Sequence, residues 1–174
     1  AKGLLKAAIR DPDPVVYFEH KKAYRMLKEE LPEEDFEVPI GKAALRRQGG
    51  DVTVISYGLM AHECLQAAEE LAGDSIAATV LDLRTLAPLD RDAILDAAKR
   101  TGKVLIVHED NLSGGIGGEV SAIIAEHAFD WLDAPVRRLA APNVPAMPFA
   151  EGMEDFCMPS REKIAAAMRA LAAY

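Results

Sequence analysis

From residue 51 onward the chain alternates short apolar runs with amphipathic stretches, and this alternation is the feature that most constrains its fold. The apolar runs are four to eight residues long and rich in valine, isoleucine and leucine, as in buried strands. The stretches after them carry apolar residues at helical spacing. We expect strands at 51–58, 76–84, 103–109 and 134–141, and helices at 59–72, from Asp90 to Gly102, from the glycines after 113 to about Trp131, and at 160–172. Strands that alternate with helices predict a doubly wound, mostly parallel α/β sheet.

The first 50 residues follow a different pattern. Residues 1–10 are expected to form a helix, the turn RDPDP ends it, and 15–19 (VVYFE) is interpreted as a buried strand. Residues 20–50 are charged and hold two prolines, which predicts a linker or crossing arm with little core of its own. The first helix begins without a capping residue ahead of it, so we expect that residues upstream are missing.

Composition excludes several classes of protein. The chain of 174 residues carries 20 basic and 28 acidic side chains, a net charge of −8, so it lacks the basic excess of a nucleic-acid-binding surface. No apolar run approaches the roughly 20 residues of a membrane span, and no signal peptide opens the chain. The two cysteines belong to no CxxC pair and are expected to be reduced thiols. The acidic balance suits a basic protein partner.

Four glycines follow a predicted strand in residues 104–124 and invite comparison with a phosphate-binding loop. A dinucleotide fingerprint that starts at Gly115 would require glycine where Val120 stands, and no lysine follows as in a Walker loop. Glu119 would lie at the start of the next helix, where its carboxylate repels anions. These features favour a role for the glycines in a tight turn and close packing.

The carboxyl ends of two predicted strands bring a second group of polar residues to one rim. His108 and Glu109 end one strand, and residues 56–58 and His62 follow another. Ligands of open α/β sheets bind at such ends, so a pocket is an option here. No base–nucleophile pair or third ligand can be assembled from these residues, and a hydrogen-bonded structural role for His108 is the alternative.

A set of short motifs occurs in an order that resembles a known family. They are residues 1–25, EVPIGKA (37–43), DVTVISYG (51–58), VLDLRTLAPLD (80–90), KRTGKVLIVHE (99–109), GGIGGEV (114–120), LDAPVRRL (132–139) and MPSREKIAAAM (158–168). Together they resemble the β subunit of the thiamine-diphosphate-dependent 2-oxo acid dehydrogenases. The stretch EHKKAYR (19–25) is more similar to the branched-chain type than to the pyruvate type. Pyruvate and acetoin dehydrogenases, a transketolase or deoxyxylulose-phosphate synthase C-terminal domain, and a free-standing ligand-binding module remain alternatives.

The resemblance implies a division of the chain and of the chemistry. Residues 1–40 resemble the tail of a pyrimidine-binding domain plus a linker, and residues 41–174 resemble a transketolase C-terminal domain. The implied reaction is oxidative decarboxylation of a 2-oxo acid with transfer of the acyl group to a lipoyl arm. Thiamine diphosphate and magnesium would be bound by the full enzyme, and the family's catalytic motifs match no residue of this chain. We therefore assign no catalytic or cofactor-binding residue and predict that the chain alone is inactive.

The resemblance also implies one metal site, for a potassium ion. In related β subunits the turn that resembles AAIRDPD contributes oxygen ligands, which by position are Ala8, Asp11 and Asp13. Oxygen-only ligands suit a hard cation. A helix-ending Asx turn without an ion is the alternative.

The implied partners are the α subunit, a second β subunit and the dihydrolipoyl acyltransferase core. By position, Asp133 and Tyr174 are the residues expected to contact the acyltransferase, whose subunit-binding domain is basic. A solvated loop carboxylate is the alternative reading of Asp133. The implied location is the cytoplasm of a bacterium or the mitochondrial matrix of a eukaryote.

Overall fold

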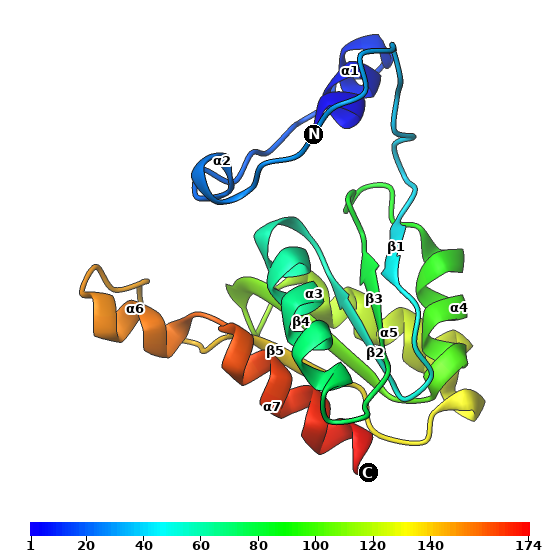
Figure 1. The fold of residues 1–174 in the computed structure, drawn as a ribbon, viewed down its shortest axis with the longest axis vertical. Coiled ribbons are helices and arrows are strands. Elements are labelled where there is room, and N and C mark those ends of the chain that lie inside the picture. The colour runs from blue at the N-terminus through cyan, green and yellow to red at the C-terminus, as the bar shows by residue number, and fades with distance from the viewer.

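The computed structural model describes residues 1–174 and shows a five-stranded sheet with helices on both faces (Figure 1). The strands are β1 (Ala44–Arg47), β2 (Val52–Ser56), β3 (Ala78–Asp82), β4 (Val104–Asn111) and β5 (Arg137–Ala141). The helices are α1 (Lys2–Arg10), α2 (Ala23–Met26), α3 (Gly58–Ala72), α4 (Arg91–Thr101), α5 (Ile116–His127), the 3-10 turn η1 (Phe129–Trp131), α6 (Glu151–Cys157) and α7 (Arg161–Ala172).

The strands lie in the order β1-β3-β2-β4-β5. Strands β3, β2, β4 and β5 are parallel. The central strand is β2, whose Val54 lies opposite Val80 of β3 on one side and Leu105 of β4 on the other. Only β1 runs antiparallel, at the outer edge of β3. The doubly wound, mostly parallel sheet predicted from the alternation of strands and helices is confirmed.

Two apolar layers bury the two faces of the sheet. Helices α3 and α7 pack together over one face, where Cys64 and Leu71 of α3 meet Ile164 and Met168 of α7. Helices α4 and α5 cover the other face, around Ile55 of β2. The strands are buried on both sides because crossover helices cover both faces, which explains their nearly continuous apolar runs.

The ends of α4 follow from local sequence. The carboxylate of Asp90 accepts a hydrogen bond from the N–H of Ala93 at 3.3 Å, which satisfies one free donor of the first turn. Gly102 ends the helix in the left-handed region, with φ of 65°. Both the cap and the terminating glycine were predicted, and both are confirmed.

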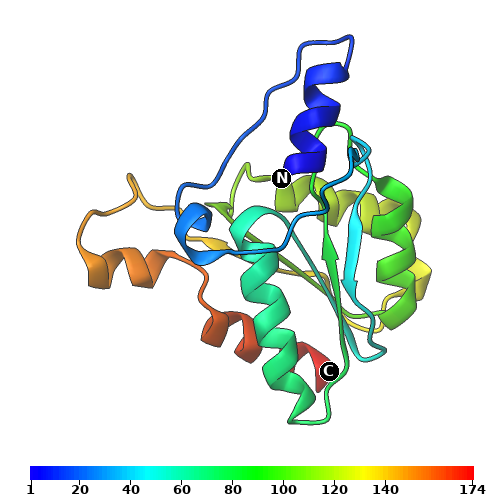
Figure 2. The same ribbon diagram turned by 45° about the horizontal axis from the view of Figure 1, so that its top comes forward.

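Residues 1–40 form an arm beside the sheet domain (Figures 1 and 2). Helix α1, predicted at 1–10, is confirmed, and it packs on the returning chain, where a Cβ on Gly3 would lie 2.7 Å from Val38. Arg10 pairs with Asp35 at 2.9 Å. Helix α2 lies near the amino-terminal end of α3 in both views.

The structure corrects several sequence predictions. The strand predicted at 15–19 is absent, because the segment has no partner strand and exposes its apolar side chains, with Phe18 91% exposed. The linker predicted at 20–50 contains α2 and the edge strand β1. Trp131, expected on the buried face of a helix, lies in η1 and is 59% exposed. Helix α6 was not predicted. The structure has no helix with the length and apolar character that crossing a membrane requires.

Candidate functional site

The carboxyl ends of β2 and β4 form the topological switch point of the sheet. Helix α3 follows β2 and helix α5 follows β4, and these helices lie on opposite faces of the sheet. The connections that leave β2 and β4 therefore run in opposite directions. Open α/β sheets bind ligands in the crevice at such a point. The residues there are Ser56 and Tyr57 after β2, and His108 and Glu109 in β4.

His108 is fully buried at this edge and does not line an open site. Neither ring nitrogen has a hydrogen-bond partner. Burial lowers the pKa of its imidazole, Arg138 acts in the same direction, and Asp110 opposes both. A neutral imidazole enclosed in this way does not serve as a base toward a bound ligand.

The glycines after β4 make room for this imidazole. A Cβ on Gly117 would lie 2.4 Å from Nε2 of His108, and a Cβ on Gly115 would lie 2.7 Å from its Cε1. Glu119 lies in the first turn of α5, at the positive end of the helix. The packing role predicted for the glycines agrees with this arrangement, and the carboxylate of Glu119 disfavours a phosphate there.

The other rim residues are divided between structural and exposed roles. The Ser56 hydroxyl donates to the carbonyl of Val107 at 2.8 Å and so ties β2 to β4. His62 is half-buried, in the second turn of α3. Burial raises the pKa of Tyr57, and the carboxylates of Asp110 and Glu109 raise it further. Because neither ring nitrogen of His108 has a hydrogen-bond partner, none of these rim residues is bonded to it.

Glu109 instead faces a broad groove beneath the arm. The groove has a volume of about 920 Å³ and lies between the segment around His20, the start of α3, and the start of α7. Nε2 of His20 lies 3.1 Å from Oε2 of Glu109 and 3.3 Å from Oε1. Sequence reasoning missed this contact, because the two residues are 89 positions apart.

The turn assigned to potassium is present as a compact helix end. The N–H of Asp13 donates to Oδ1 of Asp11 at 3.0 Å, which is the Asx turn of the alternative reading. The carbonyl of Ala8 has no backbone donor, because Pro12 stands four positions later and has no N–H. A free carbonyl beside a carboxylate fits a hard cation. The chain holds no group of three histidine, cysteine, aspartate or glutamate side chains that fits a metal ion.

Asp133 and Tyr174 lie at the opposite end of the sheet from the groove. The N–H of Asp133 donates to the carbonyl of Gly102 at 2.8 Å, and the Lys103 ammonium donates to the carbonyl of Ala172 at 2.8 Å. These bonds place the turn before β5 next to the end of α7, where Tyr174 is 66% exposed. The two residues assigned to a partner are thus on one exposed end of the domain.

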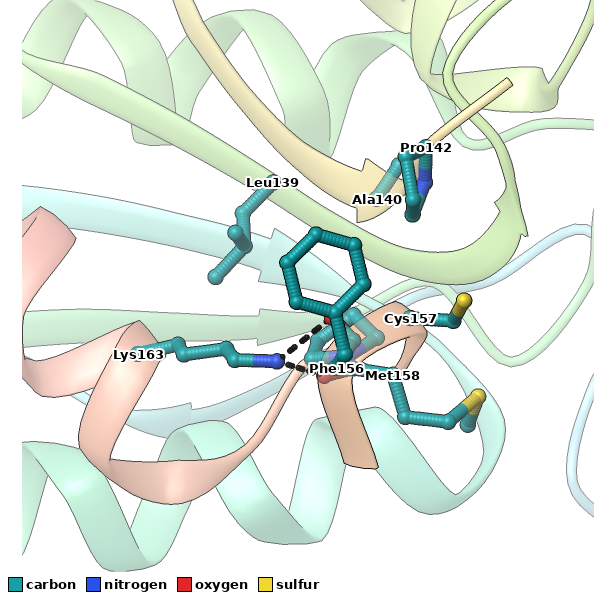
Figure 3. A pocket seen from close by; sticks show the side chains of 8 residues that line it. Leu139, Ala140, Pro142, Phe156, Cys157, Met158 and Lys163 are labelled. Carbon is teal, nitrogen blue, oxygen red and sulfur yellow. Dashed lines mark hydrogen bonds between the residues drawn. The ribbon is translucent and has the colours of Figure 1, made fainter. Parts of the chain in front are cut away.

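A second, smaller pocket of about 190 Å³ lies between β5 and the junction of α6 with α7 (Figure 3). The Lys163 ammonium donates to the carbonyls of Asp155, Phe156 and Met158 at 2.6, 2.9 and 2.8 Å. Cys157, on the pocket wall, is almost completely buried. The pocket is formed by this anchor of α6 and contains no reactive pair.

A family model for the transketolase C-terminal domain matches residues 41–164. The chain belongs to the transketolase C-terminal domain family. The matched residues include the whole sheet and helices α3, α4 and α5, and the match ends within the first turn of α7.

Similar proteins extend the comparison to the rest of the chain. The 2-oxoisovalerate dehydrogenase subunit beta of Bacillus subtilis is 58% identical over all 174 residues, which cover 53% of that protein. The pyruvate dehydrogenase E1 component subunit beta of the same organism is 45% identical, over 94% of this chain and 50% of that protein. The chain therefore spans about half the length of these relatives.

Among solved structures, a split-gene transketolase in an inactive β4 tetramer superposes with a TM-score of 0.71. It is 26% identical, and the match covers 83% of this chain and 46% of that chain. The transketolase C-terminal domain fold is thus supported by sequence and by structure.

Proposed function

We propose that the chain is the C-terminal portion of the β subunit of a branched-chain 2-oxo acid dehydrogenase. The 58% identity to the 2-oxoisovalerate enzyme's β subunit, over every residue of the chain, carries this proposal. The corresponding values are 45% for a pyruvate dehydrogenase subunit and 44% for an acetoin oxidoreductase subunit, both from the same organism. Pyruvate and acetoin enzymes are the second candidates. The compartment would be the bacterial cytoplasm or, for a eukaryotic protein, the mitochondrial matrix.

We also propose that the chain has two parts, with residues 1–40 the tail of a pyrimidine-binding domain and its linker, and residues 41–174 the C-terminal domain. The match to the family model begins at residue 41, which supports this boundary. The arm packs largely on itself, through Gly3 and Arg10, as the end of a separate domain would.

The contribution of this chain to the reaction would be structural. Thiamine diphosphate, when bound to the whole enzyme, supplies the electron sink for decarboxylation. The residues of this chain do not fit it, because His108 is enclosed and the switch-point edge carries Glu109, Asp110 and Glu119, which repel a diphosphate. The chain would instead support the α subunit and a second β subunit, and we expect it to have no decarboxylase activity alone.

A chimera tests the main proposal. Residues 1–174 would replace the matching half of the B. subtilis 2-oxoisovalerate subunit, and the chimera would be produced with its α subunit. We expect 2-oxoisovalerate decarboxylation to be retained, with pyruvate a poorer substrate. A correctly folded chimera that assembles with the α subunit yet is inactive would contradict the proposal. Tight binding of a nucleotide or sugar phosphate to the isolated chain, measured by calorimetry, would favour a free-standing module.

Ala8, Asp11 and Asp13 are proposed as part of a potassium site. The free carbonyl of Ala8 and the carboxylate of Asp11 support it. The melting temperature of the chain should be higher in potassium chloride than in lithium chloride at equal ionic strength. Asp11→Asn should remove that difference, and an equal melting temperature in both salts for the unsubstituted chain would refute ion binding.

Asp133 and Tyr174 are proposed as contacts to the dihydrolipoyl acyltransferase core. Their shared exposed end and the net charge of −8 support a basic partner. In the assembled enzyme, Asp133→Asn should weaken binding of the acyltransferase subunit-binding domain by about tenfold, within the range of a charge pair at an interface. Asp130→Asn, at an exposed position in the preceding turn η1, is the matched control. Equal affinities of the two variants would contradict the assignment.

A further inference from the structure

Two backbone irregularities lie at the outer corner of the sheet, and an arginine stands at each of them. The pairing of β1 with β3 shifts register between Leu45 and Arg47, so Arg46 is the extra residue of a β-bulge. Arg84, just beyond the end of β3, has a φ of 59°, in the left-handed region that bulky side chains rarely adopt. Bulges re-aim side chains, and strained residues of this kind cluster at ligand sites.

Asp82, the buried last residue of β3, holds both irregularities in place. Its Oδ2 accepts hydrogen bonds from Nε and Nη2 of Arg46 at 3.1 and 2.8 Å. Its Oδ1 accepts a hydrogen bond from the backbone N–H of Arg84 at 3.1 Å. The N–H of Leu83 donates to the carbonyl of Ser56 at 2.8 Å, which ties the same turn to β2. These bonds fix the strained conformation of Arg84 and the direction of both arginines.

The guanidinium of Arg84 lacks a carboxylate of its own. Arg84 belongs to none of the chain's ion pairs, whereas Arg46 is paired with Asp82. Burial lowers the pKa of Arg84, Arg46 lowers it further, and Asp82 opposes both. The corner therefore holds two guanidinium groups against a single carboxylate. A partly buried cation that faces a like charge is stabilised when an anion binds beside it.

We propose that Arg46 and Arg84 form a binding site for a carboxylate group at the carboxyl end of β3. The planar guanidinium presents N–H groups that match the two oxygens of a carboxylate. The excess of one cation over Asp82 suits a monoanion better than a dianionic phosphate. Strands β2 and β3 are parallel and end at the same edge, where open α/β sheets bind ligands. The carboxylate would come from a small organic acid or from an aspartate or glutamate of a partner protein.

Nuclear magnetic resonance of the full chain tests the site, because arginine Nε–Hε signals report on each guanidinium. Sodium acetate is the probe, and sodium chloride at equal ionic strength is its control. The signals of Arg46 and Arg84 should shift with acetate and saturate, while that of Arg47, the next residue of β1, should move little. Arg84→Met should weaken acetate binding by about tenfold, measured at Arg46, as expected for a lost hydrogen bond between charged groups. Arg47→Met is the matched control and should bind acetate as the unsubstituted chain does.

A second variant separates binding from folding. Asparagine adopts the left-handed region more readily than arginine, so Arg84→Asn should lose acetate binding without a fall in melting temperature. A large fall would show that the Arg84 side chain serves the fold, which would overturn the proposal. Shifts that fail to saturate, that chloride reproduces, or that persist with the same affinity in Arg84→Met would also overturn it.

Phenylglyoxal labelling of Arg84, followed by peptide mass spectrometry, distinguishes the two sources of the carboxylate. In the isolated chain, acetate should slow the labelling, and labelling that acetate leaves unchanged would contradict the site. The comparison with the assembled enzyme is the only step that uses the proposed α subunit. A partner's carboxylate would protect Arg84 there without acetate. A site for a small acid would instead be labelled at the rate of the isolated chain and protected by acetate in both.

Discussion

The imidazole of His108 occupies the space that a side chain on Gly117 would need. A Cβ built on Gly117 would lie 2.4 Å from Nε2 of His108 and 2.7 Å from Cδ2. Gly117 has ordinary helical geometry within α5, so its need for glycine comes from this close contact and not from its backbone conformation. A glycine-rich turn after a strand is therefore explained here by packing.

Two neighbouring glycines of α5 give a matched test of that contact. Gly117→Ala should lower the free energy of unfolding by about 1–3 kcal/mol, because the ring is enclosed and the new methyl group overpacks it. Gly118→Ala should be neutral or stabilising by up to about 1 kcal/mol, since its Cβ would meet only the end of Arg138, at 3.8 Å. Urea denaturation of both variants measures the difference. Equal stabilities would mean that His108 moves aside freely.

The buried imidazole should also make stability depend on pH. Burial lowers the pKa of His108 in the folded protein, while in the unfolded chain it returns to about 6.5. Below pH 6.5 the unfolded chain therefore binds the proton more readily than the folded one. Stability is then fully present above pH 6.5 and is lost as pH falls toward the folded pKa, by at most about 1.4 kcal/mol per pH unit.

His108→Leu should remove this pH-dependent loss. Unfolding by urea would be measured from pH 8.0 to pH 5.0 for the variant and the unsubstituted chain. The difference between the two cancels the contributions of the other histidines, which both proteins share. A difference that stays constant across this range would show that His108 does not resist protonation in the folded state.

The sequence predicted the elements whose signals are local. Strands β2 to β5 were apparent from their apolar runs, and α4 from Asp90 and Gly102, because neighbouring residues determine both features. Strand β1 was missed, because Ala44–Arg47 carries two arginines and is only partly buried. Its pairing with β3 depends on contacts with residues far along the chain.

The site was predicted less completely, for the same reason. The role of the glycines followed from the absence of a phosphate-loop pattern, whereas burial of His108 between them required the packed structure. The segment at 15–19 has the composition of a strand, but composition does not provide a partner strand. The contact of His20 with Glu109 joins parts of the chain that carry no common motif.

Asp90 shows how a local signal can understate a residue's role. Besides capping α4, its buried carboxylate accepts a hydrogen bond from the N–H of Ala43 at 3.1 Å, just before β1. Asp90→Ala should therefore lower the free energy of unfolding by about 2–4 kcal/mol, more than the roughly 1 kcal/mol of an ordinary cap, because two donors lose their acceptor. Asp92→Ala, exposed in the first turn, should cost less than about 0.5 kcal/mol. Urea denaturation measures both variants. Equal losses of stability would show that Asp90 contributes only through its charge and not through its two hydrogen bonds.

Lys163 should determine whether α6 is held in place. A seven-residue helix is unstable alone in water, and α6 has only Cys157 buried. The three carbonyls bound by Lys163 lie at or next to the last turn of α6, so the ammonium anchors this helix to α7.

Lys163→Met retains the aliphatic stem and removes the donors. Amide hydrogen exchange of residues 151–158 should then accelerate at least fivefold, while the amides of β2 and β4 change little. The control is Arg169→Met, which also lies in α7 and removes an exposed ion pair with Asp74. This variant should leave exchange in α6 unchanged. Unchanged protection of α6 in Lys163→Met would show that packing around Cys157 holds the helix by itself.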